Sequence, residues 1–362
     1  MTVARSSIVP ESGAGVFHCT SRCVRRSWLC GVDPYNGKDY SHRKQWVRDR
    51  LEELAGIYAI EVYAYAVMIN HLHVVMRVDP GKVAELSDRE VVLRWRRLFP
   101  AGRDAWGRAL EPTPDQLATW LADKETLDLW RKRLGSLSWV MRSLNESLAR
   151  RANKEDKCKG RFWEGRFKSQ RLCDAGAVMA CMAYVDLNPL RAGLAQTPES
   201  SEFTSVRERF EAECVARGET RKLESQQQGS QLKAQEKQKP QSAAWLTPVE
   251  DIVADEEFGR WGVSLAEYLE LVDVTGRMLV EGKRGTIPIH LAPVLTRLEL
   301  RAETWVRSVE SYRTIFQRMA GSRERLVSLA KNAGQKWFCR GRGARGIYAD
   351  DPTDRRVAEI DG

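Results

Sequence analysis

The chain has 362 residues, 43% of them hydrophobic, and a formal net charge of +9 at pH 7. This length favours two domains, and the basic bias favours a polyanionic partner, nucleic acid before an anionic membrane surface. No apolar run approaches the roughly 18 residues that a bilayer crossing needs, and no signal-peptide core is evident near the N-terminus, so we expect a cytoplasmic protein with no membrane partner.

The eight cysteines are scattered along the chain without a secretory pattern, which favours reduced thiols. Cys19, Cys23 and Cys30 do cluster near the N-terminus. They lack both a CxxC spacing and an evident fourth ligand, so a zinc site there is a minor alternative.

In chain order, residues 15–25 (GVFHCTSRCVR) have the pattern of a first strand, and a helix is predicted from about 41 to 55. Residues 57–78 are rich in Tyr, Val and Ile and are long enough for two strands that meet near Ile69 and Asn70. The charged, tryptophan-rich stretch from about 80 to 135 is predicted to be a helical insertion.

The second half of the chain is predicted to be mainly helical. One helix covers about 136–153, and another begins after an Asp174 cap and ends at Asn188-Pro189. Residues 219–243 are rich in Gln and Lys and lack apolar periodicity, which predicts a disordered linker. We expect a mostly helical accessory domain over 244–345 and a flexible tail over 346–362.

Two histidines stand two residues apart in the apolar run MINHLHVVM. Side chains alternate along a strand, so His71 and His73 are predicted to project from one face while Leu72 enters the core. Such a pair can bind one divalent cation. The spacing alone fits equally well two inert histidines on a solvated face.

Tyr184 and Asn188 in AYVDLNPLRAGL are one helical turn apart and are predicted to share a helix face. Asn188 could supply a carbonyl oxygen as a third metal ligand. Tyr184 could supply a phenol nucleophile, weak when neutral unless a metal polarises the substrate. A core aromatic and an ordinary helix-end asparagine are the alternatives.

These motifs, in this order with VFHCTSR and GRFWEGRFKSQRL, resemble the HUH single-tyrosine transposases, in particular the REP-associated tyrosine transposases. The resemblance covers about residues 15–200, within a transposase domain taken as 1–210. It implies an α+β, ferredoxin-like (RRM-like) antiparallel sheet with helices packed on it, to which the residues after 244 add a helical C-terminal extension. It also implies Mg²⁺ or Mn²⁺ held by His71, His73 and Asn188.

The resemblance further implies a reaction. Tyr184 would attack a phosphate of single-stranded or hairpin-forming DNA, for which repetitive palindromic elements are the expected source. A 5′-phosphotyrosine link and a free 3′-OH would result, and whether one chain or a homodimer forms the site stays open. The residues after 244 lie outside the resemblance, which favours a domesticated, chromosomal member.

A basic, aromatic stretch is the predicted DNA-binding face. From Arg142 to Arg171 there are ten Lys or Arg against four Asp or Glu. Cations neutralise phosphates and aromatic rings can stack on unpaired bases. The predicted phosphate contacts are Arg161, Arg166, Lys168 and Arg171, with Trp163 predicted to stack on a base. The alternative is a solvated helix face followed by a loop whose aromatics fold inward.

Other classes of protein fit less well. A two-histidine phosphodiesterase needs two H-x-T units, and beside His18-Cys19-Thr20 no second unit is found. A zinc deaminase would need an H-x-E unit with a later P-C-x-x-C, and neither occurs. The main alternative is a nucleic-acid-binding protein on the same fold that has lost catalysis.

Overall fold

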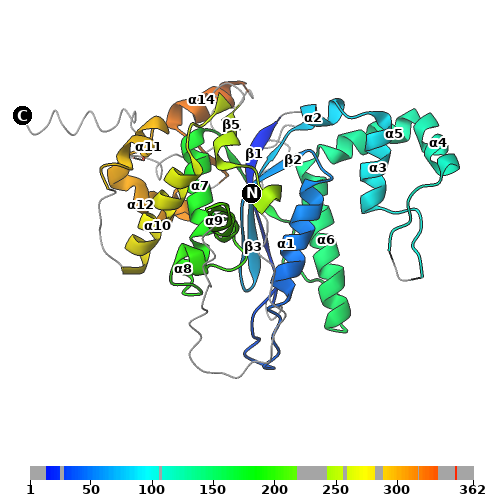
Figure 1. Cartoon of the computed structure of the whole chain (residues 1–362), viewed down its shortest axis with the longest axis horizontal. Helices are drawn as coiled ribbons and strands as arrows, with labels where there is room; N and C mark the ends of the chain where they lie inside the picture. Colours follow the sequence, from blue (N-terminus) through cyan, green and yellow to red (C-terminus); the bar gives the residue numbers. More distant parts are fainter. Residues whose placement is uncertain are drawn as a thin grey trace, which may run out of the picture.

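The protein is described by a computed structural model over residues 14–24, 28–105, 108–217, 243–255, 259–281, 288–316, 318–332 and 347–348. Within these ranges, a central five-stranded sheet carries helices on both faces (Figure 1). Almost all of the predicted linker 219–243, and most of the predicted tail 346–362, lie outside the described residues.

Four strands form an antiparallel sheet in the order β2-β3-β1-β4. Helix α1 (Arg43–Ala55) joins β1 to β2, and α6 (Leu137–Glu155) precedes β4. This βαββαβ connectivity is that of the ferredoxin-like fold, so the predicted α+β class is confirmed. The strands are β1 (Gly15–Arg22), β2 (Ile60–Val67), β3 (His71–Val78) and β4 (Lys168–Leu172).

The two faces of this sheet bury different sets of side chains. On β1, Phe17 and Cys19 enter the core that α1 and α6 cover, whereas Val16 enters the core that α7 (Ala175–Asp186) covers. On β3, Leu72 is fully buried in the first of these cores, as predicted. Period-two alternation therefore leaves His71 and His73 on the face toward α7.

The predicted insertion is helical and extends away from the sheet (Figure 1). Capping boxes start two of its helices, Ser87 with Glu90 and Thr113 with Gln116, which satisfies amide groups that lack helical partners. The helices are α2 (Pro80–Ala84), α3 (Asp88–Leu98), α4 (Pro114–Ala122) and α5 (Lys124–Leu134).

The region predicted as an accessory domain shares a hydrophobic core with α7 and the sheet. Gly176 of α7 allows the close approach, because a Cβ there would lie 2.9 Å from the carbonyl oxygen of Leu298. Strand β7 (Met319–Ala320) adds a fifth strand beside β4, and this pair is parallel, unlike the antiparallel sheet that was predicted.

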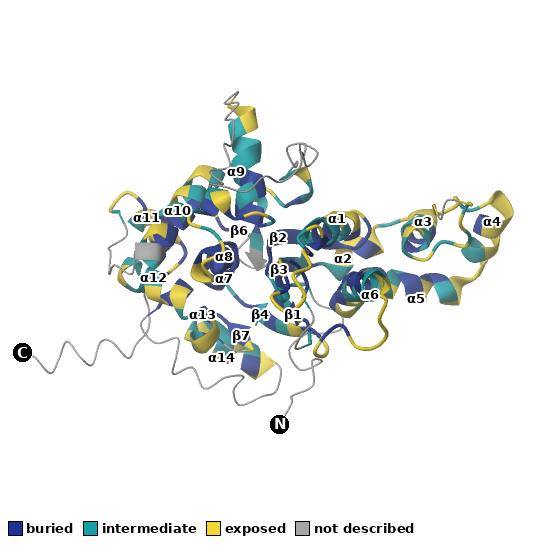
Figure 2. Ribbon diagram, turned by 90° about the horizontal axis from the view of Figure 1, so that it is seen from below, coloured by how far each residue is buried: buried dark blue, intermediate teal, exposed yellow. Residues whose placement is uncertain are grey.

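In Figure 2, buried α7 and α8 lie between the sheet and the C-terminal helices. The elements of the C-terminal region are β5 (Val253–Asp255), β6 (Gly259–Arg260), α10 (Leu265–Glu281), α11 (Ala292–Arg297), α12 (Ala302–Glu310), α13 (Tyr312–Ile315) and α14 (Arg323–Asn332).

One helix end differs from the prediction. Helix α7 ends at Asp186, two residues before the expected Asn188, and a short helix α8 (Asn188–Arg191) follows. Pro189 has no N–H to continue α7, but it is tolerated in the first turn of α8. Gly193, with a φ of +68°, then reverses the chain toward α9 (Ser205–Ala216).

Candidate active site

Three neighbouring strands bring polar side chains together on the face toward α7. In the register of the sheet, Thr20 of β1 lies opposite both His73 of β3 and Lys168 of β4. Arg22 lies opposite His71 in the same way. The histidine pair is therefore one edge of a polar patch that β1 completes.

His18 of β1 bonds directly to the histidine pair. Its Nε2 lies 2.8 Å from Nδ1 of His73, and the two rings stack with centroids 5.1 Å apart. The hydroxyl of Thr20 lies 3.3 Å from the same Nδ1 of His73. Nε2 of His73 is buried and has no hydrogen-bond partner among the described residues. An orphaned buried imidazole nitrogen is costly in a resting fold and fits a position that awaits a ligand.

His71 projects from the same face of β3, as predicted, with its ring centroid 4.9 Å from that of His73. Its Nδ1 lies 2.7 Å from the side-chain oxygen of Asn70, which holds the ring orientation and leaves Nε2 for another contact. Burial, with Arg22 and Arg313 nearby, lowers the pKa of His71 to about 4.

The other two histidines are also held neutral. Burial lowers the pKa of His18 to about 4, against an opposing hydrogen bond to Gln170. Burial and the adjacent His18 keep the pKa of His73 well below its usual value. At neutral pH all three rings carry lone pairs, the form that binds metals.

Tyr184 lies in α7 beside this cluster and is 2% exposed. Its ring meets His73 edge-on at 5.7 Å and His18 at 6.0 Å between centroids. Its hydroxyl has no hydrogen-bond partner in the described part of the chain. The other tyrosines buried to this degree all engage their hydroxyls: Tyr58, Tyr63, Tyr65, Tyr268 and Tyr312.

Both ends of α7 are anchored. Asp174 caps the N-terminus, as predicted, by accepting the Ala177 amide at 2.8 Å. At the other end, the fully buried Asp186 accepts from the hydroxyl of Tyr268 and from the amide of Val206. These bonds fix the helix, and with it the position of Tyr184, against the sheet.

Asn188 is buried, and its side-chain amide donates to the carbonyl oxygen of Tyr184 at 3.0 Å. Its side-chain oxygen, Oδ1, accepts no hydrogen bond from the described residues. Asn188 makes no hydrogen bond to His71 or His73 in the described structure. Among the described residues, no group of three or more His, Cys, Asp or Glu side chains could hold a metal ion.

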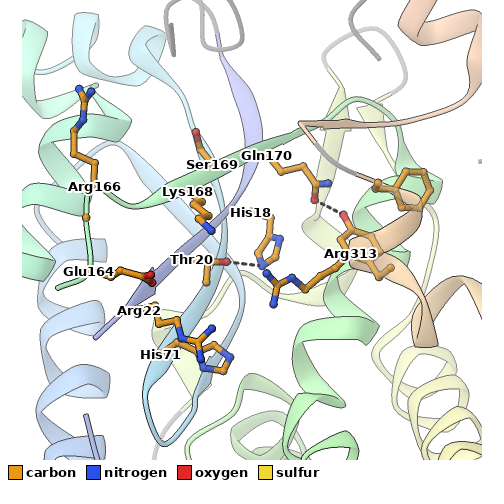
Figure 3. A pocket seen from close by; sticks show the side chains of 13 residues that line it. His18, Thr20, Arg22, His71, Glu164, Arg166, Lys168, Ser169, Gln170 and Arg313 are labelled. Carbon is orange, nitrogen blue, oxygen red and sulfur yellow. Dashed lines mark hydrogen bonds between the residues drawn. The ribbon is translucent and has the colours of Figure 1, made fainter. Parts of the chain in front are cut away.

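A cavity of about 540 Å³ opens on the patch (Figure 3). His18, Thr20 and His71 line it together with four cationic side chains, Arg22, Arg166, Lys168 and Arg313. His73 and Tyr184 do not line it. Tyr312 does line it, and it also stacks on Tyr184 with centroids 4.9 Å apart.

Only some of the predicted DNA-binding residues line the cavity. Arg166 and Lys168 line the cavity. Arg161 is exposed, with its guanidinium 3.4 Å from the carbonyl oxygen of Glu164. Arg171 does not line the cavity.

Trp163 requires a correction. It is 8% exposed, its indole N–H donates to the carbonyl oxygen of Asn145 at 2.8 Å, and its ring packs against Phe162. An aromatic with its N–H satisfied in the core is not presented to a base, so the predicted stacking role is not supported.

The cysteine cluster is part of the core. Cys19, Cys23 and Cys30 are buried, and the Cys30 thiol donates to the carbonyl oxygen of Met68. Burial raises the pKa of Cys23 and of Cys30 to about 12, which keeps both thiols protonated.

One solved structure resembles this chain. A REP-associated tyrosine transposase solved with a REP hairpin superposes with a TM-score of 0.34 and 15% identity, over 60% of this chain and 87% of the neighbour. No protein-family model matches the chain, and no curated protein matches it significantly. No described helix has both the length and the apolar character needed to cross a bilayer. The function is therefore inferred from the side chains of the site.

Proposed function

We propose that this protein is a single-tyrosine transposase that cleaves and rejoins single-stranded, hairpin-forming DNA. The observation that supports it most directly is the juxtaposition of Tyr184, with its unpartnered hydroxyl, and His73, with its orphaned Nε2. The adjoining cationic cavity suits a phosphodiester backbone. Together these groups supply a nucleophile, a metal-binding nitrogen and a substrate-binding surface.

The side-chain chemistry of His71, His73 and Asn188 suits a divalent metal. His71, His73 and Asn188 would hold Mg²⁺ or Mn²⁺ through two imidazole nitrogens and one amide oxygen, a donor set in which the nitrogens favour Mn²⁺. The hydrogen bonds of Asn70 to His71 and of His18 to His73 hold the orientation of the two imidazole rings. When bound, the ion would polarise the scissile phosphate and stabilise charge on its oxygens.

The remaining steps belong to the chain itself. The phenol oxygen of Tyr184 would bond to phosphorus as the bond from phosphorus to the 3′-oxygen breaks, giving a 5′-phosphotyrosine and a free 3′-OH. The phenol gives up a proton and the 3′-oxygen takes one up, so the step is balanced. The phosphodiester energy is retained in the covalent link, and the 3′-OH of another strand can reverse the step without ATP.

Tyr312 imposes a condition on this mechanism. Because it stacks on Tyr184, which is 2% exposed and does not line the cavity, the phenol must become more accessible before it can reach a phosphate there. The same burial favours the alternative of a nucleic-acid-binding protein that has lost catalysis, in which Tyr184 is only part of the core.

A covalent-adduct assay separates the two functions. Full-length protein is mixed with labelled single-stranded hairpin DNA and Mn²⁺, and the products are resolved on a denaturing gel. A metal-dependent, protease-sensitive band that Tyr184→Phe abolishes supports the transposase. Retained affinity without cleavage, across several hairpins and metals, supports the binding protein.

A further inference from the structure

The C-terminal region supplies a cation to the cavity. Arg313 lies in the short helix α13, in the part of the chain outside the sequence resemblance, and its exposed side chain lines the cavity. Figure 3 shows it directed toward His18 and Thr20 of β1. The cavity is thus built from both the ferredoxin-like region and the C-terminal region.

The position of Arg313 is fixed by its neighbour in the sequence. Tyr312 is 1% exposed and stacks on Tyr184, and its hydroxyl donates to the side-chain oxygen of Gln170 on β4 at 2.7 Å. Phe316, one turn later, packs on the Tyr312 ring at 5.2 Å. Because these contacts hold Tyr312 in place, the backbone of Arg313 is held next to the cavity.

The positive charges around the cavity favour the binding of an anion. Arg22, Lys168 and Arg313 come from three separate elements, and none forms an ion pair with a carboxylate in the described residues. Glu164 is the acidic side chain among the lining residues. Like charges that converge without partners repel one another, and a bound phosphate would remove that repulsion while accepting their hydrogen bonds.

We infer that this cavity binds a backbone phosphate of single-stranded nucleic acid, and that Arg313 is one of the phosphate-binding residues. The choice of nucleic acid as the phosphate source rests on the proposed function. The charge and geometry of the cavity do not depend on cleavage, so binding can be tested apart from catalysis.

The test measures binding of full-length protein to labelled oligothymidine by fluorescence anisotropy between about 50 and 200 mM salt. Each lost phosphate contact lowers the slope of log affinity against log salt by about 0.7 for a single strand. We expect Arg313→Ala to lower the slope by that amount and the affinity at about 50 mM salt by about ten-fold or more. Arg313→Lys should keep most of the slope, and Arg313→Glu should weaken binding further.

Arg307→Ala is the matched control, because Arg307 is exposed on α12 and does not line the cavity. It should bind as the unaltered protein does. Inorganic phosphate at matched ionic strength should compete with the oligonucleotide only weakly if a polymer is the ligand. Strong competition by phosphate, weakened by Arg313→Ala, would instead identify a free-phosphate site and overturn the nucleic-acid assignment.

Failure of this inference is distinguishable from failure of the proposed function. If wild-type protein forms the Tyr184 adduct but Arg313→Ala leaves both slope and affinity unchanged, the phosphate role of Arg313 is wrong and the transposase stands. If no adduct forms but Arg313→Ala lowers the slope, the phosphate site stands without the catalysis. Unchanged thermal midpoints exclude misfolding as the cause.

Discussion

The buried His18 predicts a steep loss of stability in mild acid. His18 is 7% exposed, and burial lowers its pKa from 6.5 to about 4. Between these values the unfolded chain takes up a proton that the folded chain does not, so the free energy of unfolding falls as the pH falls. The stabilisation is fully present above about pH 6.5 and is lost toward about pH 4.

The size of the effect follows from the two pKa values. The pKa of His18 is 6.5 in the unfolded chain and about 4 in the folded chain, a difference of about 2.5 pKa units. Each pKa unit corresponds to about 1.36 kcal/mol, so the full effect on the free energy of unfolding is about 3 kcal/mol. Relative to about pH 8, linkage gives a loss of about 1.4 kcal/mol at about pH 5.5 and about 2.5 kcal/mol at about pH 4.5. His71 and His73 act in the same direction, so the whole protein should lose more than this.

Urea unfolding at these pH values, on wild type and His18→Asn, isolates the contribution of His18. The variant starts less stable because it loses the bond to His73, but its stability should fall less steeply with pH. Equal slopes for wild type and His18→Asn would show that His18 is not held neutral by burial.

Three further outcomes are expected. His71→Ala should abolish Mn²⁺ binding in isothermal titration calorimetry while His42→Ala preserves it; equal binding by both would remove His71 from the metal site. Gly176→Ala places a Cβ 2.9 Å from the backbone oxygen of Leu298 and should lower the free energy of unfolding by about 1–3 kcal/mol. In the control Gly165→Ala, the new Cβ meets nothing within 4 Å, so the free energy of unfolding should change by no more than about 0.5 kcal/mol. Trp163→Ala should cost about 3–5 kcal/mol of stability as a core truncation; a stable variant with weakened DNA binding would instead restore the stacking role.

Local patterns in the sequence accounted for most of the ferredoxin-like core. The two strands within 57–78, their meeting near Ile69, and the shared face of His71 and His73 follow from period-two alternation, which any single strand displays. Helix α7 and its Asp174 cap were likewise local features. The predicted end of α7 was two residues too late. Pro189 is compatible both with the end of one helix and with the first turn of the next, and here it lies in the first turn of α8.

The partners of the histidines could not be predicted in the same way. The sequence marks His18 only as half of a two-histidine phosphodiesterase motif, and its contact with His73 depends on the pairing of β1 with β3. That register is set by long-range packing, not by nearby residues. The H-x-T unit on a strand with the same alternation was the signal that could have indicated it.

Tyr312 and Arg313 carried no comparable signal. They lie in a four-residue helix that becomes part of the site only because the C-terminal region packs on α7 and β4. Trp163 was misassigned for the opposite reason. Its basic surroundings suggested a surface, but the fold turned its ring into the core.

The most direct test of the proposed function is the chemical identity of the protein–DNA link. After incubation with Mn²⁺ and a single-stranded hairpin, proteolysis and mass spectrometry should find a nucleotide on the peptide that contains Tyr184, joined through a 5′-phosphate. His73→Ala should remove the adduct, and Tyr35→Phe, at an exposed tyrosine, should preserve it. An adduct on another residue, or none with any hairpin that the protein binds, would contradict the assignment of Tyr184 as the nucleophile.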